Sequence, residues 1–128
     1  MTSVDYTVAR YIFARHMPPE SAPLSAQVFQ ILLSLVDDDL HGYAIIQDVR
    51  ERSGGEINLT ASTLYAAIKR LLDSGWIEET RTRPRDDDAR RRYYHLTDIG
   101  RTAARAEAQR LERLAAMARA KRLITAKR

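Results

Sequence analysis

The chain has no cysteine, five glycines and a single tryptophan among its 128 residues. The absence of cysteine excludes disulfides, thiol nucleophiles and thiolate metal ligands. The longest apolar runs, such as residues 31–36, are far shorter than the roughly 20 residues that a membrane-spanning helix needs. The three histidines lie on separate segments, and the sequence has no glycine-rich phosphate loop and no pair of histidines at metal-ligand spacing. We therefore expect neither an enzyme, nor a cofactor or metal site, nor a membrane protein.

The residues that are present are typical of one soluble globular domain, with 45% hydrophobic and 30% charged side chains. The formal net charge of +4 is distributed unevenly. The last ten residues carry five basic side chains and no acidic one, and residues 81–92 carry six arginines against three aspartates. Such local basic charge indicates either contact with a polyanion or a solvated surface. The N-terminal residues lack the basic stretch and apolar core of a secretory signal, which predicts a cytoplasmic protein.

An amphipathic helix is predicted over residues 60–75. Leucine and isoleucine side chains at 64, 68, 71 and 72 recur on one stripe, which we expect to face the core. Thr60 is a typical N-cap, and Gly75 is a typical left-handed stop. The opposite face can contact DNA or simply be solvated. It carries hydroxyl groups, a phenol and cations, on Ser62, Thr63, Tyr65, Lys69 and Arg70.

The residues that follow this helix predict a β-hairpin. Two runs rich in β-branched and aromatic residues flank a polar, proline-containing middle. Trp76 and Ile77 begin the first strand, and Tyr94 and Leu96 on the second strand are expected to pack into the core. The tip is acidic (86–88), so either the arginine flanks contact phosphate or the acids pair with neighbouring arginines until DNA displaces them. The flanking cations are Arg81, Arg83, Arg85, Arg90, Arg91 and Arg92.

Two further helices are predicted before residue 60. One begins after Ser25, and the other begins at His41 and ends at the glycine pair 54–55. Residues 56–59 then form a short link or a small strand that pairs with the hairpin. The three aspartates at 37–39 are predicted to form a solvated turn, because consecutive carboxylates do not converge on a metal. Two helices, a turn and a third helix give the order of a helix-turn-helix, whose last helix enters the major groove of DNA. The first helix is expected to bury Val28, Phe29, Leu32, Leu33 and Val36, and the second Ile45, Ile46 and Val49.

A long final helix is predicted to begin at Thr97, where Asp98 supplies an acid in the first turn. Small and apolar side chains then recur at alternating spacings of four and three, which is typical of a seam between two packed helices. A homodimer would cover such a seam on a small domain; the alternative is that the helix packs only on its own domain. The seam consists of Ala104, Ala108, Leu111, Ala115 and Ala118, widened by Leu114 and Met117.

Three stretches together resemble the PadR family of bacterial transcriptional regulators, in its short form with a single C-terminal helix. They are LHGYAIIQDV (40–49), TASTLYAAIKRLLDSGWIE (60–78) and RRRYYHLTDIGR (90–101), and the resemblance covers residues 24–123. It implies a mainly α homodimeric winged helix with a small β-hairpin wing, usually a repressor that binds a palindromic operator and is released by a small molecule or another cue. It also implies that Ser62, Thr63, Tyr65 and Lys69 contact DNA from the recognition helix, with the hairpin arginines as flanking contacts.

Two departures from the family pattern limit this resemblance. The family's wing tip is more often glycine-rich or basic than triply acidic. Some members bind flat aromatic drugs between tryptophans of the final helix, but here residues 99–128 contain no aromatic side chain. A stacking drug site is therefore not expected, and an apolar space between the N-terminal and C-terminal helices is the alternative effector site. Its candidate lining is Tyr6, Tyr11 and Phe13, although we favour the alternative that these side chains pack in the core or at the dimer interface.

The sequence thus predicts three parts. Residues 1–20 form an N-terminal helical extension, with a helix over residues 4–16 or, as the alternative, a frayed terminus. Residues 21–96 form the winged helix-turn-helix, and residues 97–128 form the dimerisation helix and a basic tail. The competing hypothesis is a winged helix used for protein contacts or for non-specific DNA binding. Salt separates the two kinds of interface, because binding through several arginines weakens steeply as salt rises.

Overall fold

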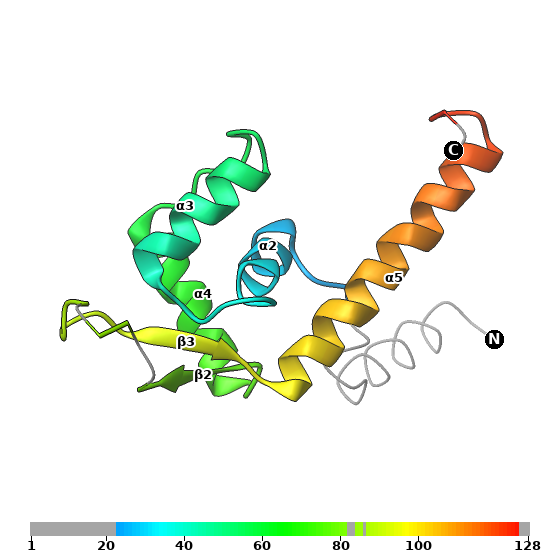
Figure 1. The fold of residues 1–128 in the computed structure, drawn as a ribbon. Coiled ribbons are helices and arrows are strands. Elements are labelled where there is room, and N and C mark those ends of the chain that lie inside the picture. Colours follow the sequence, from blue (N-terminus) through cyan, green and yellow to red (C-terminus); the bar gives the residue numbers. More distant parts are fainter. Residues whose placement is uncertain (1–22, 82–83, 86, 126–128) are drawn as a thin grey trace, which may run out of the picture.

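The computed structural model describes residues 23–81, 84–85 and 87–125. The helix expected over residues 4–16, the expected effector lining and Arg83 lie outside these residues. Four helices and three short strands follow one another along the described chain (Figure 1). They are α2 (Ala26–Ser34), β1 (Leu40–His41), α3 (Gly42–Arg52), α4 (Ala61–Asp73), β2 (Ile77–Thr80), β3 (Tyr93–Leu96) and α5 (Asp98–Ala120).

All four helices begin at the caps that the sequence predicted. Each cap side chain accepts a hydrogen bond from a backbone N–H in the first turn, at 3.1–3.3 Å. The predicted stops are also confirmed, since the glycines after α3 and α4 have positive φ angles of 63°, 87° and 75°. Each of these caps and stops involves only residues of the same short segment of sequence. The caps are Ser25, His41, Thr60 and Thr97.

The sheet has three antiparallel strands in the order β1-β3-β2. The hairpin pairs as expected, with Ile77 opposite Leu96 and Thr80 opposite Tyr93. The third strand is Leu40–His41, so the alternative that residues 56–59 pair with the hairpin is wrong. The amides of residues 56 and 57 instead donate to the backbone carbonyl and hydroxyl of Ser53, which holds this segment in a turn.

The core lies between the sheet and the helices, and it contains most of the predicted apolar residues. The α4 stripe is buried, as expected, except that Leu72 is 37% exposed and lies at the edge; Trp76 is buried as well. The face of α2 is rotated from the prediction: Phe29 and Leu33 are only half-buried, because Ile31 and Leu35 point inward. The fully buried side chains with the largest volumes are Ile31, Leu32, Ile45, Leu64, Ile77 and Val49.

The start of α5 is fixed to the end of α4 by the Thr97–Gly100 turn. The Thr97 hydroxyl lies 2.6 Å from the Gly75 carbonyl oxygen and 2.9 Å from that of Trp76. A Cβ atom on Gly100 would lie 2.0 Å from the Trp76 carbonyl oxygen, so only glycine allows this close approach. The direction of α5 therefore depends on this junction.

The two halves of α5 have different surroundings. The first half packs on α2, and its buried Glu107 accepts hydrogen bonds from the Leu24 amide (3.2 Å) and from the guanidinium of Arg110 (2.6 and 2.9 Å). The second half projects away from the other elements (Figure 1). There Leu114 is 47% exposed and Met117 is 62% exposed. Within the described residues, no helix is both long and apolar enough to cross a membrane.

Candidate nucleic-acid interface

The predicted recognition face lies on the outside of α4. A network of hydroxyl groups forms its N-terminal end: the Thr60 hydroxyl donates to the Thr63 hydroxyl (2.9 Å) and lies 3.3 Å from that of Ser62. Hydroxyl groups both donate and accept, so they can bond base edges or phosphates. The cationic side chains lie further along the same helix. All five predicted residues, Ser62, Thr63, Tyr65, Lys69 and Arg70, are exposed.

Tyr65 is held against the first residue of α3. A Cβ atom on Gly42 would lie 2.4 Å from the Tyr65 hydroxyl oxygen and 2.9 Å from the ring carbon that bears it, so the phenol rests directly on the Gly42 backbone. Tyr65 nevertheless remains 50% exposed. The stretches LHGYAI and STLY are therefore in contact in space. Because glycine at position 42 has no side chain, the Tyr65 phenol fits between α3 and α4.

A groove of about 410 Å³ lies between this phenol, the start of α3 and the wing. Its most exposed aromatic side chain, Tyr43, is 62% exposed, and sequence reasoning missed it as a candidate contact. The signal was its place in the first turn of a helix, where backbone N–H groups point outward. Three consecutive arginines make the groove cationic. Its lining is His41, Gly42, Tyr43, Tyr65, Arg90, Arg91, Arg92 and Tyr94.

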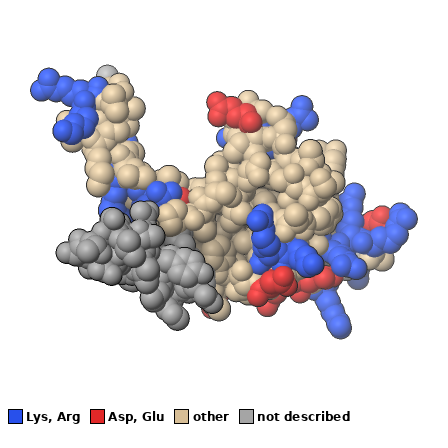
Figure 2. Space-filling model, turned by 180° about the vertical axis from the view of Figure 1, so that it is seen from behind, with Lys and Arg blue, Asp and Glu red and all other residues tan. Residues whose placement is uncertain are grey.

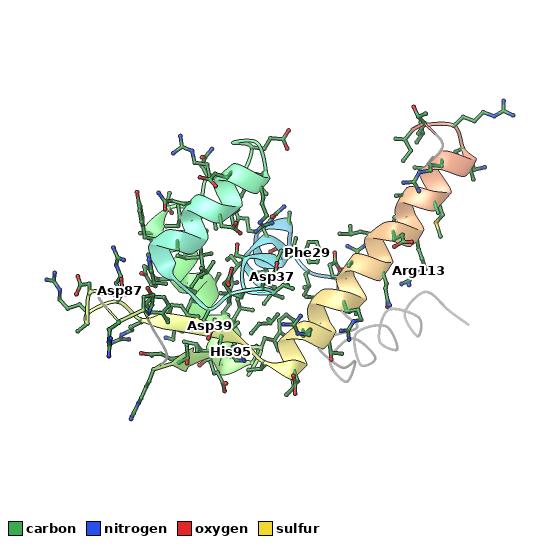
Figure 3. All side chains as sticks on the ribbon, viewed as in Figure 1. Phe29, Asp37, Asp39, Asp87, His95 and Arg113 are labelled. Carbon is green, nitrogen blue, oxygen red and sulfur yellow. The ribbon has the colours of Figure 1, made fainter. Side chains whose placement is uncertain are left out.

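Asp87 lies at the wing tip (Figure 3) and forms an ion pair with Arg91, four residues further along the chain. Its carboxylate lies 2.8 Å from Arg91 Nη1, and its side chain is only 9% exposed. The neighbouring Tyr93 hydroxyl, followed by Arg91, holds the pKa of Asp87 below its ordinary value. Burial, followed by the Asp87 charge, raises the pKa of Tyr93. Tyr93 also meets His41 edge-on, at 5.3 Å between ring centroids.

Asp88 pairs with Arg90 on the outside of the same turn. Two guanidinium nitrogens of Arg90, Nε and Nη2, reach the two carboxylate oxygens at 3.2 and 3.1 Å. The alternative in which the acidic tip pairs with neighbouring arginines is therefore confirmed for Asp87 and Asp88.

Charge gathers at two ends of the molecule, as the sequence predicted. On the rear face, Lys and Arg side chains gather at the wing and at the far end of α5 (Figure 2). Arg81 and Arg85 are exposed in the wing, while Arg83 lies outside the described residues. Burial, followed by the charge of Arg91, lowers the pKa of His41, so this ring is less readily protonated beside the cationic groove. Among the described residues, no cluster of acidic, histidine or cysteine side chains is arranged for a metal ion.

The predicted seam on α5 divides between core and surface. Ala104 is 6% exposed and belongs to the core of its own domain, so its side chain does not lie on a free surface. Its burial follows from the Gly100 junction, which presses the first turns of α5 onto the core. Ala115 and Ala118 are partly exposed, and Ala108, Leu111 and Leu114 are exposed.

A family model described as the Transcriptional regulator PadR-like family matches residues 31–106, more than half of the chain. The chain belongs to this PadR-like family. The family consists of transcriptional regulators and not of enzymes, and this chain has the winged-helix fold of its solved members. The PadR-like match begins in α2 and ends within α5, just before Glu107, so the projecting half of α5 lies beyond it.

Solved structures of PadR proteins have the same arrangement. A PadR family transcription regulator from hypervirulent Clostridium difficile R20291 is 27% identical, with a TM-score of 0.65, over 74% of this chain and 96% of that chain. The Bacillus subtilis PadR in complex with operator DNA is 28% identical, with a TM-score of 0.54, over 63% of this chain and 46% of that chain.

A curated relative gives a shorter match. Uncharacterized protein X of Lysinibacillus sphaericus is 30% identical over 71 residues, which are 56% of this chain. The chain spans 64% of that relative, slightly less than two thirds of its length.

Proposed function

We propose that this PadR-like protein is a sequence-specific regulator that binds a palindromic operator as a homodimer, acts as a repressor, and is released by a small-molecule effector or another cue. The observation that carries the proposal is the cationic groove, which joins the exposed face of α4 to the arginines of the wing. The solved B. subtilis PadR in complex with operator DNA supports the choice of double-stranded DNA as partner.

In this proposal the exposed face of α4 enters the major groove. Ser62 and Thr63 at its N-terminal end meet base edges, because the first turns of a recognition helix reach deepest into the groove. Lys69 and Arg70 lie one to two turns further along and hold the phosphate backbone. The wing cations then hold the backbone that flanks this site. The proposed wing contacts are Arg81, Arg83, Arg85, Arg90, Arg91 and Arg92.

The homodimer is proposed to form through the projecting half of α5. Leu111, Leu114 and Met117 are 41%, 47% and 62% exposed, which is a large apolar area for one side of a solvated helix. A second copy of the same helix would bury these side chains together with Ala108, Ala115 and Ala118. We accordingly propose residues 21–96 as the DNA-binding part and residues 97–128 as the dimerisation part, with the contact made by the later turns of α5.

The direct test is fluorescence anisotropy with duplex DNA from upstream of the protein's own coding region, with a shuffled duplex as reference, at two salt concentrations. Specific binding predicts a preference for the native duplex at both salts, with a steep loss of affinity as salt rises. Lys69→Ala should weaken binding to all sequences and lower the salt slope by about one. Lys121→Ala removes the same charge at the far end of α5 and serves as the matched control.

Selection from a random duplex pool tests the palindrome without knowledge of the regulated genes. A homodimer predicts selected sequences with two inverted half-sites about one helical turn apart, or a multiple of it. Selected sites without inverted symmetry would contradict the dimeric part of the proposal.

A ligand screen against the preformed complex then tests release by an effector. Equal binding to every duplex would instead support a non-specific role, and no binding at either salt would favour the protein-contact alternative.

A further inference from the structure

We propose that the two adjacent wing acids act on DNA binding in opposite directions. Asp87 is a positioning residue that holds Arg91 toward the groove and supports DNA binding. Asp88 is an internal substitute for phosphate that occupies Arg90 and opposes DNA binding. This inference rests on the proposed function, because it assigns roles within the same DNA interface.

The contact between Asp88 and Arg90 has the geometry of a guanidinium bound to an anion. Both carboxylate oxygens are engaged side-on by Nε and Nη2, and the Arg90 backbone N–H also donates to Oδ1 at 2.9 Å. A DNA phosphate is recognised by arginine through the same pair of parallel hydrogen bonds. The Arg90 side chain is 91% exposed and Asp88 is 40% exposed, so the pair faces solvent at the rim of the groove. DNA must therefore replace the carboxylate before it can use this side of Arg90.

The contact between Asp87 and Arg91 differs in both geometry and burial. The carboxylate meets Arg91 at one nitrogen, Nη1, and the guanidinium carries more donors than this contact uses. The Asp87 side chain is only 9% exposed and interacts with Tyr93, whereas Arg91 is 47% exposed and lines the groove. A buried carboxylate behind a half-exposed cation fixes the direction of the cation without covering its front. Asp87 therefore orders Arg91 before DNA arrives, which lowers the entropic cost of binding.

The two roles predict opposite effects for the same change of charge. Asp88→Asn frees Arg90 and should tighten binding to any duplex, on the order of fivefold, with a steeper salt dependence from one additional phosphate contact. Asp87→Asn releases Arg91 from its fixed position and should weaken binding, on the order of fivefold. A simple electrostatic effect predicts that both variants tighten binding, since each removes one negative charge at nearly the same place. Each variant therefore serves as the control for the other.

The experiment is an anisotropy titration of the full chain with the native and shuffled duplexes, over a series of salt concentrations. Each Asn variant is also made with its arginine partner replaced, as Asp88→Asn with Arg90→Gln and Asp87→Asn with Arg91→Gln. Each Asn substitution should lose its effect once the partner arginine is absent. A merely structural role of Asp87 would instead weaken binding equally in the Arg91→Gln background. A thermal melt of every variant identifies damage to the fold, and Asp87→Glu should restore part of the affinity because it keeps the carboxylate.

The outcomes are distinguishable. Opposite shifts that vanish with the partner arginines support the proposal. Equal tightening by both Asn variants, or an Asp87→Asn loss that persists without Arg91, overturns it while leaving the proposed function intact. Failure of the wild-type protein to bind any duplex at low salt would overturn the proposed function, and this inference with it.

Discussion

The contact between Gly42 and Tyr65 gives a sharp test of how α3 and α4 form one surface. Gly42→Ala places a methyl group 2.4 Å from the Tyr65 hydroxyl oxygen and 2.9 Å from its ring carbon, well inside van der Waals contact. If the ring stayed in place, the overpacking would cost about 1–3 kcal/mol. Tyr65 is 50% exposed, however, and its ring can turn into solvent. We expect the ring to move, because this costs less than shifting the backbone.

Gly42→Ala should therefore change stability little and DNA affinity strongly. Alanine restricts the unfolded chain and recovers roughly 0.4–1 kcal/mol, so the free energy of unfolding should change by no more than about 1 kcal/mol. DNA affinity should fall much more, because the displaced phenol no longer faces the groove. A hydrogen bond to a charged phosphate is worth about 1.5–3 kcal/mol. The expected loss in affinity is therefore about tenfold or more.

Thermal melts and anisotropy titrations of four proteins test this reasoning: the wild type, Gly42→Ala, Tyr65→Ala and the double variant. If Gly42 acts only by seating Tyr65, the double variant should bind DNA as weakly as Tyr65→Ala alone. Losses that simply add would show that Gly42 has an independent role. Unchanged DNA binding by Gly42→Ala would refute the proposed place of Tyr65 in the interface.

Three further predictions concern α5. In Gly100→Ala the new Cβ would lie 2.0 Å from the backbone oxygen of Trp76, and neither atom can turn away. The variant should therefore be destabilised by about 2–3 kcal/mol, as measured by denaturant unfolding. Leu111→Asp should convert the dimer to monomers in analytical ultracentrifugation, and a variant that stays dimeric would contradict the proposed interface. The contact with Arg110 lowers the pKa of Glu107. The ionised Glu107 carboxylate therefore stabilises the fold above the ordinary pKa of glutamate, and this stabilisation is lost as pH falls through the lowered pKa. In thermal melts between neutral and acidic pH, Glu107→Gln should lose less stability on acidification than the wild type. An equal loss would contradict this role of Glu107.

Local features of the fold were predictable because they depend on neighbours in sequence. The helix caps at Ser25, Thr60 and Thr97 each satisfy a backbone amide within three residues, so the sequence contains both partners of the contact. The stripe of α4 follows from helical periodicity, apart from Leu72 at its edge. The family resemblance likewise depends on contiguous stretches, and the matched family model confirms it.

The third strand was not predictable in the same way. Residues 40–41 are too short to give a strand pattern, and they pair with β3 only because the chain between α2 and α3 passes beside it. The alternative strand at residues 56–59 does not belong to the sheet, which consists of β1, β3 and β2 in the described chain. The amides of residues 56 and 57 were already satisfied by the turn after α3.

The candidate site shows the same division. The sequence by itself determined which residue types the interface offers: hydroxyls and cations on one helix face, and arginines around an acidic hairpin tip. Only the tertiary structure decided how they combine, placing Tyr65 on Gly42, adding Tyr43 to the groove and setting Asp87 behind Arg91. It also drew Ala104 into the core and left the later turns of α5 exposed. The physical reason is range: caps and periodicity act within a few residues, whereas these contacts depend on how whole elements pack.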